Sequence, residues 1–515
     1  MMAAKTARAL KLFSCLSWIL ILAASFSAGL QVNLEGEPAS RFPLPTVTSL
    51  PASPSRAGHE AAPCDQGGIP PWIPLRAIPR GKPQGILSLV NPAVDSLNIL
   101  PERARARIMD EWLRWRLDRI LPELMRREGI DLWLVMSNEP DPGPVYFTLL
   151  PAASLYVVRT SILMFHDRGK ELGVERLSGG SSGIGDWYKP TWLDKKNKTQ
   201  FESLAEMIKK MNPKRIGINT SPLWGYGDHL TAGLKDKLVG ALGPEYSKRL
   251  VSAGRLCVGW LETRSPQEMS VYRHICGISH DLIAEFFSNK VIVPDVTTTE
   301  DVEWWFRQRV RDLGVDPWFH PSIDIQRSKK KEAEYKDKDR DVIRRGDLLH
   351  CDIGIRYLGL YTDMQWSAYV LQTGETDAPK GLKEALANAN RVADILMAEF
   401  REGRTGNEVV DSAMKKGESE GLRPLIYTHP IGVYGHAAGP PIDARATESA
   451  PEGSRLRGEY PLYLNTMHSI EFSATTKVPE WEGQDIRIGY EDDAIFTTEG
   501  CAFADGGQKA LLLIR

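Results

Sequence analysis

The sequence predicts an α+β domain at residues 264–515, preceded by an α/β domain at residues 101–253. Three observations support this division. The chain has 515 residues, and a single core usually stops growing at about 250–300. Buried-type strands alternate with amphipathic helices in the first segment. The second segment runs through two helices, strands, two helices and strands, an order that suggests duplicated halves, although no residue-level repeat is visible.

The first hundred residues differ from the rest. Lys5, Arg8 and Lys11 precede an apolar run at 12–24 and then small residues. This order is typical of a secretory signal peptide, so we expect residues 1–29 to be removed and the protein to be exported, to a periplasm or outside the cell. No stable membrane span should then remain; an uncleaved anchor is the alternative. Residues 30–100 are rich in Pro and Ala, which predicts a linker or a surface arm.

Composition excludes several classes of partner. The formal net charge is −2, and no Lys/Arg run resembles a nucleic-acid patch, so we expect no nucleic acid to bind. Cys15 would leave with the signal peptide. The five remaining cysteines are widely spaced and form neither a disulfide framework nor a CxxC metal site.

The segment 101–253 carries the pattern of an α/β domain. Apolar residues at helical spacing follow Pro101, and Gly129 is placed to end that helix. IDLWLVMS reads as a buried strand, SLYVVRTSILMFHD as two strand pieces and RIGINTS as another, with a short helix at 201–211. The segment contains no nucleophile elbow, phosphate loop or metal spacing. Its expected role is to shape one wall of a cleft or to mediate oligomerisation.

Helix signals in the C-terminal segment are clear. Ser265, Pro266 and Glu268 have the spacing of a capping box with proline at the first helical position. A second capped helix follows Pro294 and ends at Gly314. Two more helices are predicted at 379–400 and 405–417.

The stretch 347–371 is the centre of the functional prediction. It contains two apolar, strand-like runs on either side of a break at 357–359, with Asp352 in one run and Asp363 in the other. In a hairpin the two aspartates would face each other almost symmetrically. Two carboxylates in an apolar sheet need a cation or a proton between them; edge aspartates facing solvent are the alternative.

Further polar residues interrupt apolar runs downstream. His429 and His436 lie in the Gly-rich stretch YTHPIGVYGHAAGPP, Glu471 lies in MHSIEFSATT, and Glu491 begins the acidic triplet of IRIGYEDDAIF. Four carboxylates and an imidazole are a ligand set that suits two divalent ions. Such a pair activates a bridging water and polarises a carbonyl.

The order Asp, ten residues, Asp, then His, Glu and Glu resembles the metal-ligand series of the M24 metallopeptidase superfamily. This superfamily includes methionine aminopeptidase, aminopeptidase P and prolidase. The resemblance implies a pita-bread catalytic domain at 264–515, with a creatinase/prolidase-like N-terminal domain before it. It further implies two divalent metal ions, with Mn²⁺ expected and Co²⁺ or Zn²⁺ as alternatives. A homodimer is expected on the same ground.

The resemblance assigns roles to individual residues. Asp352 would bind one metal, Asp363 and Glu491 would bridge both, and His429 with Glu471 would complete the second. His429 is assigned to the metal because it opens an HxxG and is followed by a second His seven residues later. His436 would stabilise the tetrahedral intermediate, and Glu471 would also act as general base.

The implied function is a secreted exopeptidase that resembles Xaa-Pro aminopeptidases or dipeptidases. It would cleave a peptide or dipeptide near the N-terminus with a metal-bridging hydroxide. Three departures concern substrate binding. A His usual some seventeen residues before the first ligand Asp is missing, with His320 as a partial substitute; SIEFS replaces TIEPG; and Gly489 replaces an Arg, with Arg487 nearby. A non-catalytic binding protein on the same fold and a metal-free creatinase-like C–N hydrolase are the alternatives.

Overall fold

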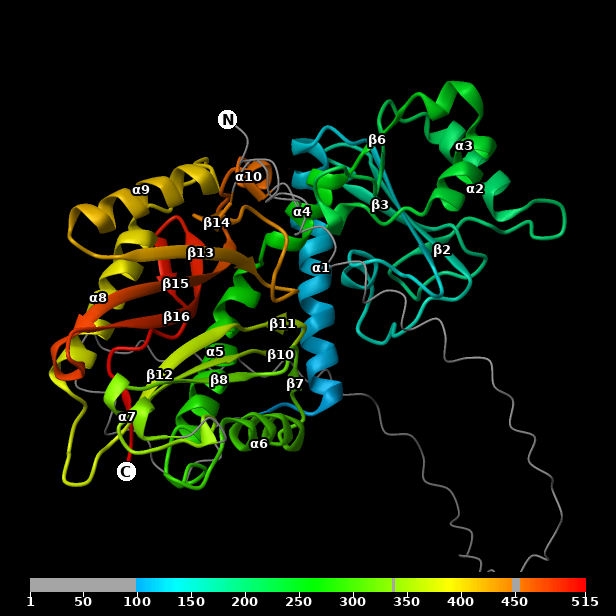
Figure 1. The fold of residues 1–515 in the computed structure, drawn as a ribbon. Helices are drawn as coiled ribbons and strands as arrows, with labels where there is room; N and C mark the ends of the chain where they lie inside the picture. Colours follow the sequence, from blue (N-terminus) through cyan, green and yellow to red (C-terminus); the bar gives the residue numbers. More distant parts are fainter. Residues whose placement is uncertain (1–98, 336–338, 447–453) are drawn as a thin grey trace, which may run out of the picture. The chain divides into compact units, whose positions relative to one another are not determined.

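The computed structural model describes residues 99–335, 339–446 and 454–515 (Figure 1). The expected signal peptide at 1–29 and nearly all of the expected linker therefore lie outside the described residues and stay predictions. Within the described part, no helix is both long enough and apolar enough to cross a membrane. The cysteines at 257, 276, 351 and 501 are all free.

The N-terminal domain is built on a six-stranded sheet in the order β4-β3-β2-β1-β5-β6. Its elements are α1 (Glu102–Arg127), β1 (Leu132–Asn138), η2 (Tyr146–Leu149), β2 (Thr160–Asp167), β3 (Val174–Ser178), β4 (Lys189–Pro190), α2 (Gln200–Met211), β5 (Ile216–Ile218), η3 (Gly225–Gly227), α3 (Ala232–Ser247), β6 (Leu250–Ser252) and α4 (Gly254–Glu262). Strand β1 pairs antiparallel with β2 and parallel with β5, which gives the sheet its mixed character. The expected α/β organisation is present.

One strand prediction in this domain was wrong. The stretch 154–167 forms the single strand β2, and the residues before Thr160 join no ladder. Leu155, Tyr156 and Val158 are 81%, 74% and 62% exposed. Their strand-like composition is therefore not matched by a partner strand or a core, and propensity alone does not make a strand.

A buried charged cluster joins the two domains. Arg116 of α1 lies 3.0 Å from the Glu268 carboxylate of α5, and Arg264 lies 2.8 Å from it. Arg116 also donates to the Thr263 carbonyl at 2.8 Å. All three charged side chains are almost fully buried, so each depends on the others to compensate for lost hydration.

The C-terminal domain is organised around a nine-stranded sheet whose main path is β14-β13-β15-β16-β12-β9-β8. Strands β17 and β18 add to β16 and β12. Its elements are α5 (Pro266–Phe286), α6 (Thr299–Asp312), β7 (Asp316–Pro317), β8 (Ser322–Gln326), α7 (Lys329–Glu334), β9 (Leu348–Ile353), β10 (Ile355–Tyr357), β11 (Leu360–Tyr361), β12 (Met364–Val370), α8 (Lys380–Ala398), α9 (Gly406–Ser419), β13 (Pro424–Ile431), β14 (Ile442–Asp443), α10 (Ser454–Arg457), β15 (Thr466–Val478), η5 (Pro479–Trp481), β16 (Gln484–Thr497), β17 (Gly500–Phe503) and β18 (Leu512–Ile514).

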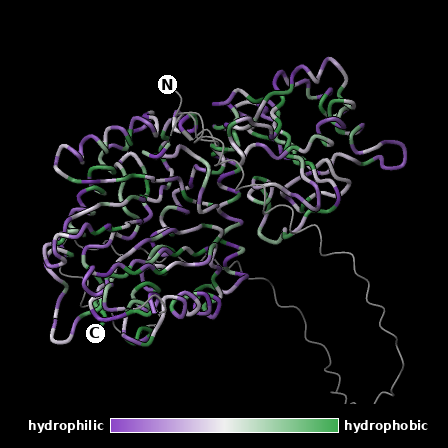
Figure 2. Tube along the Cα trace, viewed as in Figure 1, coloured by the Kyte–Doolittle hydropathy of each residue, from purple (hydrophilic) through white to green (hydrophobic). Residues whose placement is uncertain are grey.

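Two helix pairs cover two halves of this sheet. Helices α5 and α6 share a core with β9 and β12, and α8 and α9 share another with β13, β15 and β16. Hydrophobic and hydrophilic residues alternate along α8 and α9, as expected of helices with one buried face (Figure 2). The duplicated order of elements that the sequence predicts is therefore confirmed.

Strand alternation separates the core face from the polar face. Ile470 and Phe472 of β15 pack into the core with α8 and α9. Glu471 lies between them and so points to the opposite face. Glu471 pairs in register with Glu491 of β16, which places two of the predicted ligands side by side.

The hairpin register differs from the prediction. Asp352 of β9 pairs with Gln365 of β12, not with Asp363, which lies just before β12 begins. The intervening chain forms its own small pair, β10 with β11, around left-handed residues at Leu358 and Gly359 (φ 52° and 75°). Asp352 and Asp363 are therefore diagonal neighbours, a spacing that a symmetrical hairpin does not predict.

Candidate metal centre

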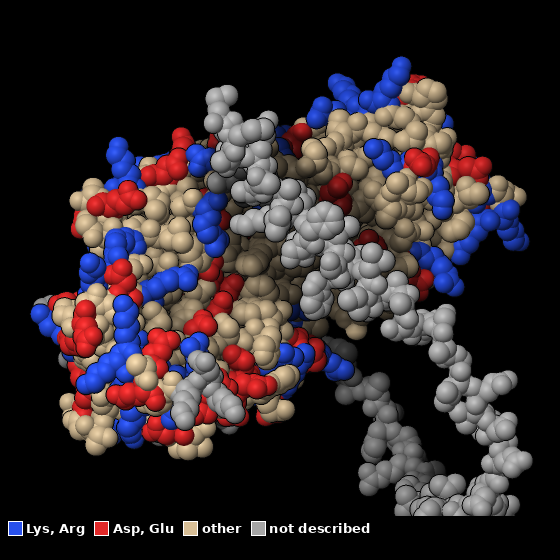
Figure 3. Space-filling model, viewed as in Figure 1, with Lys and Arg blue, Asp and Glu red and all other residues tan. Residues whose placement is uncertain are grey.

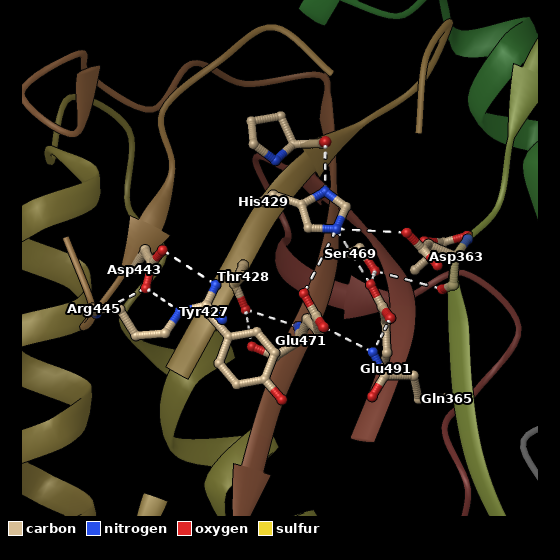
Figure 4. A network of polar contacts seen from close by, with 12 residues as sticks. Asp363, Gln365, Tyr427, Thr428, His429, Asp443, Arg445, Ser469, Glu471 and Glu491 are labelled. Carbon is tan, nitrogen blue, oxygen red and sulfur yellow. Dashed lines mark hydrogen bonds and ion pairs between the residues drawn. The ribbon is translucent and has the colours of Figure 1, made fainter. Parts of the chain in front are cut away.

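The structure brings all five predicted metal ligands together on the polar face of the large sheet. Figure 4 shows four of them, Asp363, His429, Glu471 and Glu491. Three groups of possible ligands overlap, and in each one ligand atom per residue lies within 4.8 Å of the others: Asp352, Asp363 and Glu491; His429, Glu471 and Glu491; and Asp363, His429 and His436. Glu491 is common to the first two groups. The residues come from β9, the start of β12, β13, β15 and β16.

His429 is at the centre of the carboxylates. Its Nε2 lies 3.3 Å from Glu491 Oε1, 3.6 Å from Asp363 Oδ2 and 3.8 Å from Glu471 Oε2. Its Nδ1 lies 2.9 Å from the Pro430 carbonyl. A proton on Nδ1 would donate to that carbonyl and leave the Nε2 lone pair directed at the carboxylates, which is the usual state of a ligating histidine.

Unpartnered polar atoms show that the cluster fits a cation. Asp352 Oδ1, Asp363 Oδ1 and His429 Nε2 are buried and have no hydrogen-bond partner among the described residues. Buried polar atoms are almost always paired. Three such atoms on three predicted ligands, in an oxygen-rich set with one imidazole, fit divalent ions of the Mn²⁺, Co²⁺ or Zn²⁺ type.

Electrostatics point the same way. Burial, reinforced by neighbouring carboxylates, raises the pKa values of Asp363 and Glu491 well above their ordinary range. Burial and the Glu491 charge raise the pKa of Glu471 to about 8. Burial lowers the pKa of His429. Without a cation, these carboxyls tend to stay protonated and the imidazole neutral. A bound cation would favour the charged carboxylates.

His436 lies beside His429 and forms the third ligand group with Asp363 and His429, but among the described residues it makes no ion pair with the carboxylates of the first two groups. Its ring centroid is 4.6 Å from that of His429 and 5.6 Å from that of Trp318. Burial and then the nearby His429 lower its pKa to about 4, so at neutral pH it is an uncharged donor. The Tyr226 hydroxyl donates to the His436 carbonyl, which ties the loop of His436 to the N-terminal domain.

Two cavities meet at His436. One of about 640 Å³ is lined by His429, Glu471, Asp443 and Trp224, among others. The other, of about 550 Å³, is lined by Trp318, Tyr361 and Arg356, among others. Both include Tyr226 and His436, so residues from both domains contribute to the wall of each cavity. Volumes of this size suit small ligands.

Several residues of the site were missed from the sequence. Gln365 donates to Glu471 and Glu491 at 2.7 and 2.6 Å. Trp318 donates from Nε1 to the Thr362 carbonyl at 2.8 Å and lines the second cavity. A polar residue in an apolar strand was the only available signal for Gln365, and nothing in its local sequence marks Trp318.

Two residues considered as substitutes lie elsewhere. His320 contacts Glu303 at 3.5 Å and stacks near Trp304 of α6, and it lines neither cavity. It therefore does not take the place of the missing upstream histidine. Arg487 donates to the Tyr427 hydroxyl at 2.9 Å.

Comparisons with known proteins show which proteins have a similar sequence or fold. Residues 270–498 match the model of metallopeptidase family M24. The X-Pro aminopeptidase of Thermotoga maritima is 16% identical in sequence, with a TM-score of 0.52, over 76% of this chain and 99% of that one. The Xaa-Pro dipeptidase of Bacillus anthracis is 17% identical over 79% and 99%, and its TM-score of 0.47 adds no weight. The comparison with curated proteins gives no match.

The fold and the site together define a pita-bread domain with a carboxylate–imidazole cluster suited to metal. Residues 270–498 of this domain are similar to metallopeptidase family M24, a family of metal-dependent hydrolases. On the face shown in Figure 3, acidic and basic side chains are interspersed.

Proposed function

We propose that this protein is an exported, dinuclear-metal exopeptidase that hydrolyses a peptide bond near the N-terminus of short peptides, with Xaa-Pro and Xaa-Xaa substrates as the candidates. The observation that carries the proposal is the convergence of Asp352, Asp363, His429, Glu471 and Glu491, with three buried atoms unpartnered, at cavities that share His436.

The ligand groups suggest how two ions would be held. Asp352 would hold one ion, His429 and Glu471 the other, with Asp363 and Glu491 reaching both; Mn²⁺ is the proposed metal. When bound, such a pair activates water and polarises the scissile carbonyl. Glu491 is common to the first two groups in the structure, in agreement with a bridging role.

Glu471 is suited to move a proton. Its pKa of about 8 in the metal-free protein shows a carboxyl that takes up a proton readily, because burial and Glu491 oppose its charge. A bound cation would lower that pKa toward the range useful to a general base. The Glu471 backbone N–H donates to the Thr428 hydroxyl oxygen at 2.9 Å, and that hydroxyl donates to the Glu471 carbonyl at 2.9 Å, so the backbone that carries the carboxyl is fixed.

His436 is suited to stabilise negative charge on the substrate. As a neutral imidazole it has one N–H to donate, and the site offers it no carboxylate partner among the ion pairs of the described residues. A donor directed at the carbonyl oxygen stabilises the tetrahedral state more than the ground state. The Tyr226 contact holds the backbone of this residue in place.

The cavities indicate a short substrate that crosses His436. The cavity with Glu471 and Asp443 is suited to the amino end, and the aromatic cavity with Trp318 and Tyr361 to the residue after the scissile bond. A proline ring or another apolar side chain would pack against such walls. Export through the predicted signal peptide and assembly as a homodimer are parts of this proposal that rest on the sequence.

Metal analysis followed by a peptide assay tests the proposal. Purified protein should bind two Mn²⁺ per chain and hydrolyse members of a panel of Xaa-Pro and Xaa-Xaa dipeptides and tripeptides, with loss of activity in chelator. Two bound ions without turnover of any peptide would favour a binding protein on this fold. Turnover unaffected by chelation would instead favour the creatinase-like reading.

A further inference from the structure

Gln365 occupies a position between predicted ligands on both neighbouring strands. In the sheet register it pairs with Asp352 of β9 and with Glu491 of β16. Its side chain is buried, with the residue only 5% exposed. The Gln365 amide can therefore act on the metal centre only through the carboxylates that it contacts.

The amide divides the oxygens of two carboxylates. Gln365 Nε2 donates to Glu471 Oε1 at 2.7 Å and to Glu491 Oε2 at 2.6 Å. The other oxygens, Glu471 Oε2 and Glu491 Oε1, are the ones near His429 Nε2, at 3.8 and 3.3 Å. One oxygen of each glutamate thus accepts from Gln365, and the other lies toward His429 (Figure 4). Glu491 Oε1 also accepts from the Ser469 hydroxyl at 2.6 Å, which holds this oxygen in place beside His429.

A second pair of residues fixes which way the amide faces. Gln365 Oε1 lies 3.0 Å from His350 Nε2, and His350 Nδ1 lies 3.3 Å from Asp324 Oδ2. With its NH₂ group donating to two carboxylates, the amide oxygen needs a donor, and His350 supplies it. Reversal of the amide would place its oxygen against two carboxylates, which is repulsive.

Gly489 provides the space for this arrangement. A Cβ at that position would lie 2.6 Å from His350 Nε2 and 3.1 Å from Gln365 Oε1. Any larger residue would therefore displace the His350–Gln365 contact. The glycine, the histidine and the glutamine together form one unit behind the ligands.

We propose that Gln365, oriented by His350 and Asp324, is a positioning residue that restricts Glu471 and Glu491 to one oxygen each at the His429 side of the metal centre. This inference rests on the proposed metal site. One imidazole nitrogen and two single carboxylate oxygens suit transition-metal ions such as Mn²⁺ or Co²⁺. They suit Ca²⁺ poorly, because Ca²⁺ prefers six to eight oxygens with bidentate carboxylates. Gln365 therefore sets both affinity and ion selectivity at this position.

Titration of chelator-treated full-length protein with Mn²⁺, followed by calorimetry, tests the inference. Gln365→Leu should weaken one of the two binding events by about 10–100-fold and reduce the preference for Mn²⁺ over Ca²⁺. His350→Phe removes no hydrogen bond to a predicted ligand, yet it should weaken the same event through Gln365. The double variant should lose little more than either single variant, because the residues act as one unit. The visible spectrum of the Co²⁺-loaded protein should change in both.

Gln508→Leu is the matched control, since Gln508 is also buried and also bonds to β12, through the Ser367 backbone at 2.9 and 2.6 Å. It should lower thermal stability without altering either binding event.

Wild-type Mn²⁺ affinities in both His350→Phe and Gln365→Leu, or fully additive losses, would overturn the inference. If Gln365→Leu does not fold, His350→Phe alone decides. Absence of Mn²⁺ binding by the wild type would overturn both this inference and the proposed function. Two-ion binding that depends on Gln365 without any peptide hydrolysis would overturn only the function.

Discussion

Replacing Glu491 by glutamine should have opposite effects on stability with and without metal. Glu491 is 1% exposed and belongs to two of the three candidate ligand groups. Two unit charges about 4 Å apart repel by about 4 kcal/mol at an effective dielectric constant of about 20. The raised pKa values of Asp363 and Glu491 mean that bound protons already relieve part of this repulsion. The net gain for the metal-free variant should be about 1–2 kcal/mol.

The same substitution should abolish the response to metal. A ligand that binds only the folded state stabilises it by about 2.7 kcal/mol at a concentration 100 times Kd, so two ions would add roughly 5 kcal/mol to the wild type. Glu491→Gln removes a ligand from two groups and should retain little of this. In Mn²⁺ the variant should therefore be the less stable protein.

Urea denaturation in chelator and in Mn²⁺ measures both effects. Asp485→Asn is a control on the same strand, because Asp485 is exposed and pairs with Arg423 at 2.7 Å; it should shift stability slightly and equally in both conditions. A Glu491→Gln variant that is less stable than wild type in chelator would refute the repulsion argument. Equal stabilisation of variant and wild type by Mn²⁺ would refute the ligand assignment.

Three further predictions concern neighbouring groups. His429→Ala should lower metal content, whereas His436→Ala should keep the metal and lower kcat; the reverse pattern, by metal analysis and rate assay, would exchange their roles. Gly435→Ala would place a Cβ 2.3 Å from the Trp318 ring, so it should cost about 1–3 kcal/mol and raise KM, in contrast to an alanine at an open glycine. His280 has its pKa raised to about 10, against the opposing effect of burial, by its two carboxylate partners. Its stabilisation is complete below the unfolded pKa near 6.5 and is lost as pH rises toward 10. The wild type should thus lose roughly 3–5 kcal/mol more than His280→Gln across that interval in chelator-free urea titrations, and parallel curves would contradict this.

Local signals predicted the helices well. The capping box of Ser265 and Glu268, with Pro266 at the first position, is present in α5, and the helix predicted at 379–400 is α8, Lys380–Ala398. Caps and apolar spacing are determined within a few residues of chain, so a sequence contains them in full.

The strand register and the contacts between residues far apart in the sequence could not be predicted from local signals. Asp352 pairs with Gln365 because the turn region forms strands of its own. Strand propensity does not predict this register. The order of the candidate ligands was enough to group the five residues, since four lie in strands of one sheet and Asp363 directly precedes another. The role of Gln365 depends on which way an amide faces, and that is fixed by His350 and Gly489 from other strands.

The loop of His436 is held by residues of the N-terminal domain, which lies outside the family match. The family match starts at residue 270, but Tyr226 bonds to the His436 carbonyl and the Tyr434 hydroxyl donates to the Pro144 carbonyl at 2.6 Å. A fragment cut at the family boundary would keep every candidate metal ligand and lose both anchors of the residue assigned to the transition state. If the proposed function holds, we expect such a fragment to bind metal and to lose peptide hydrolysis.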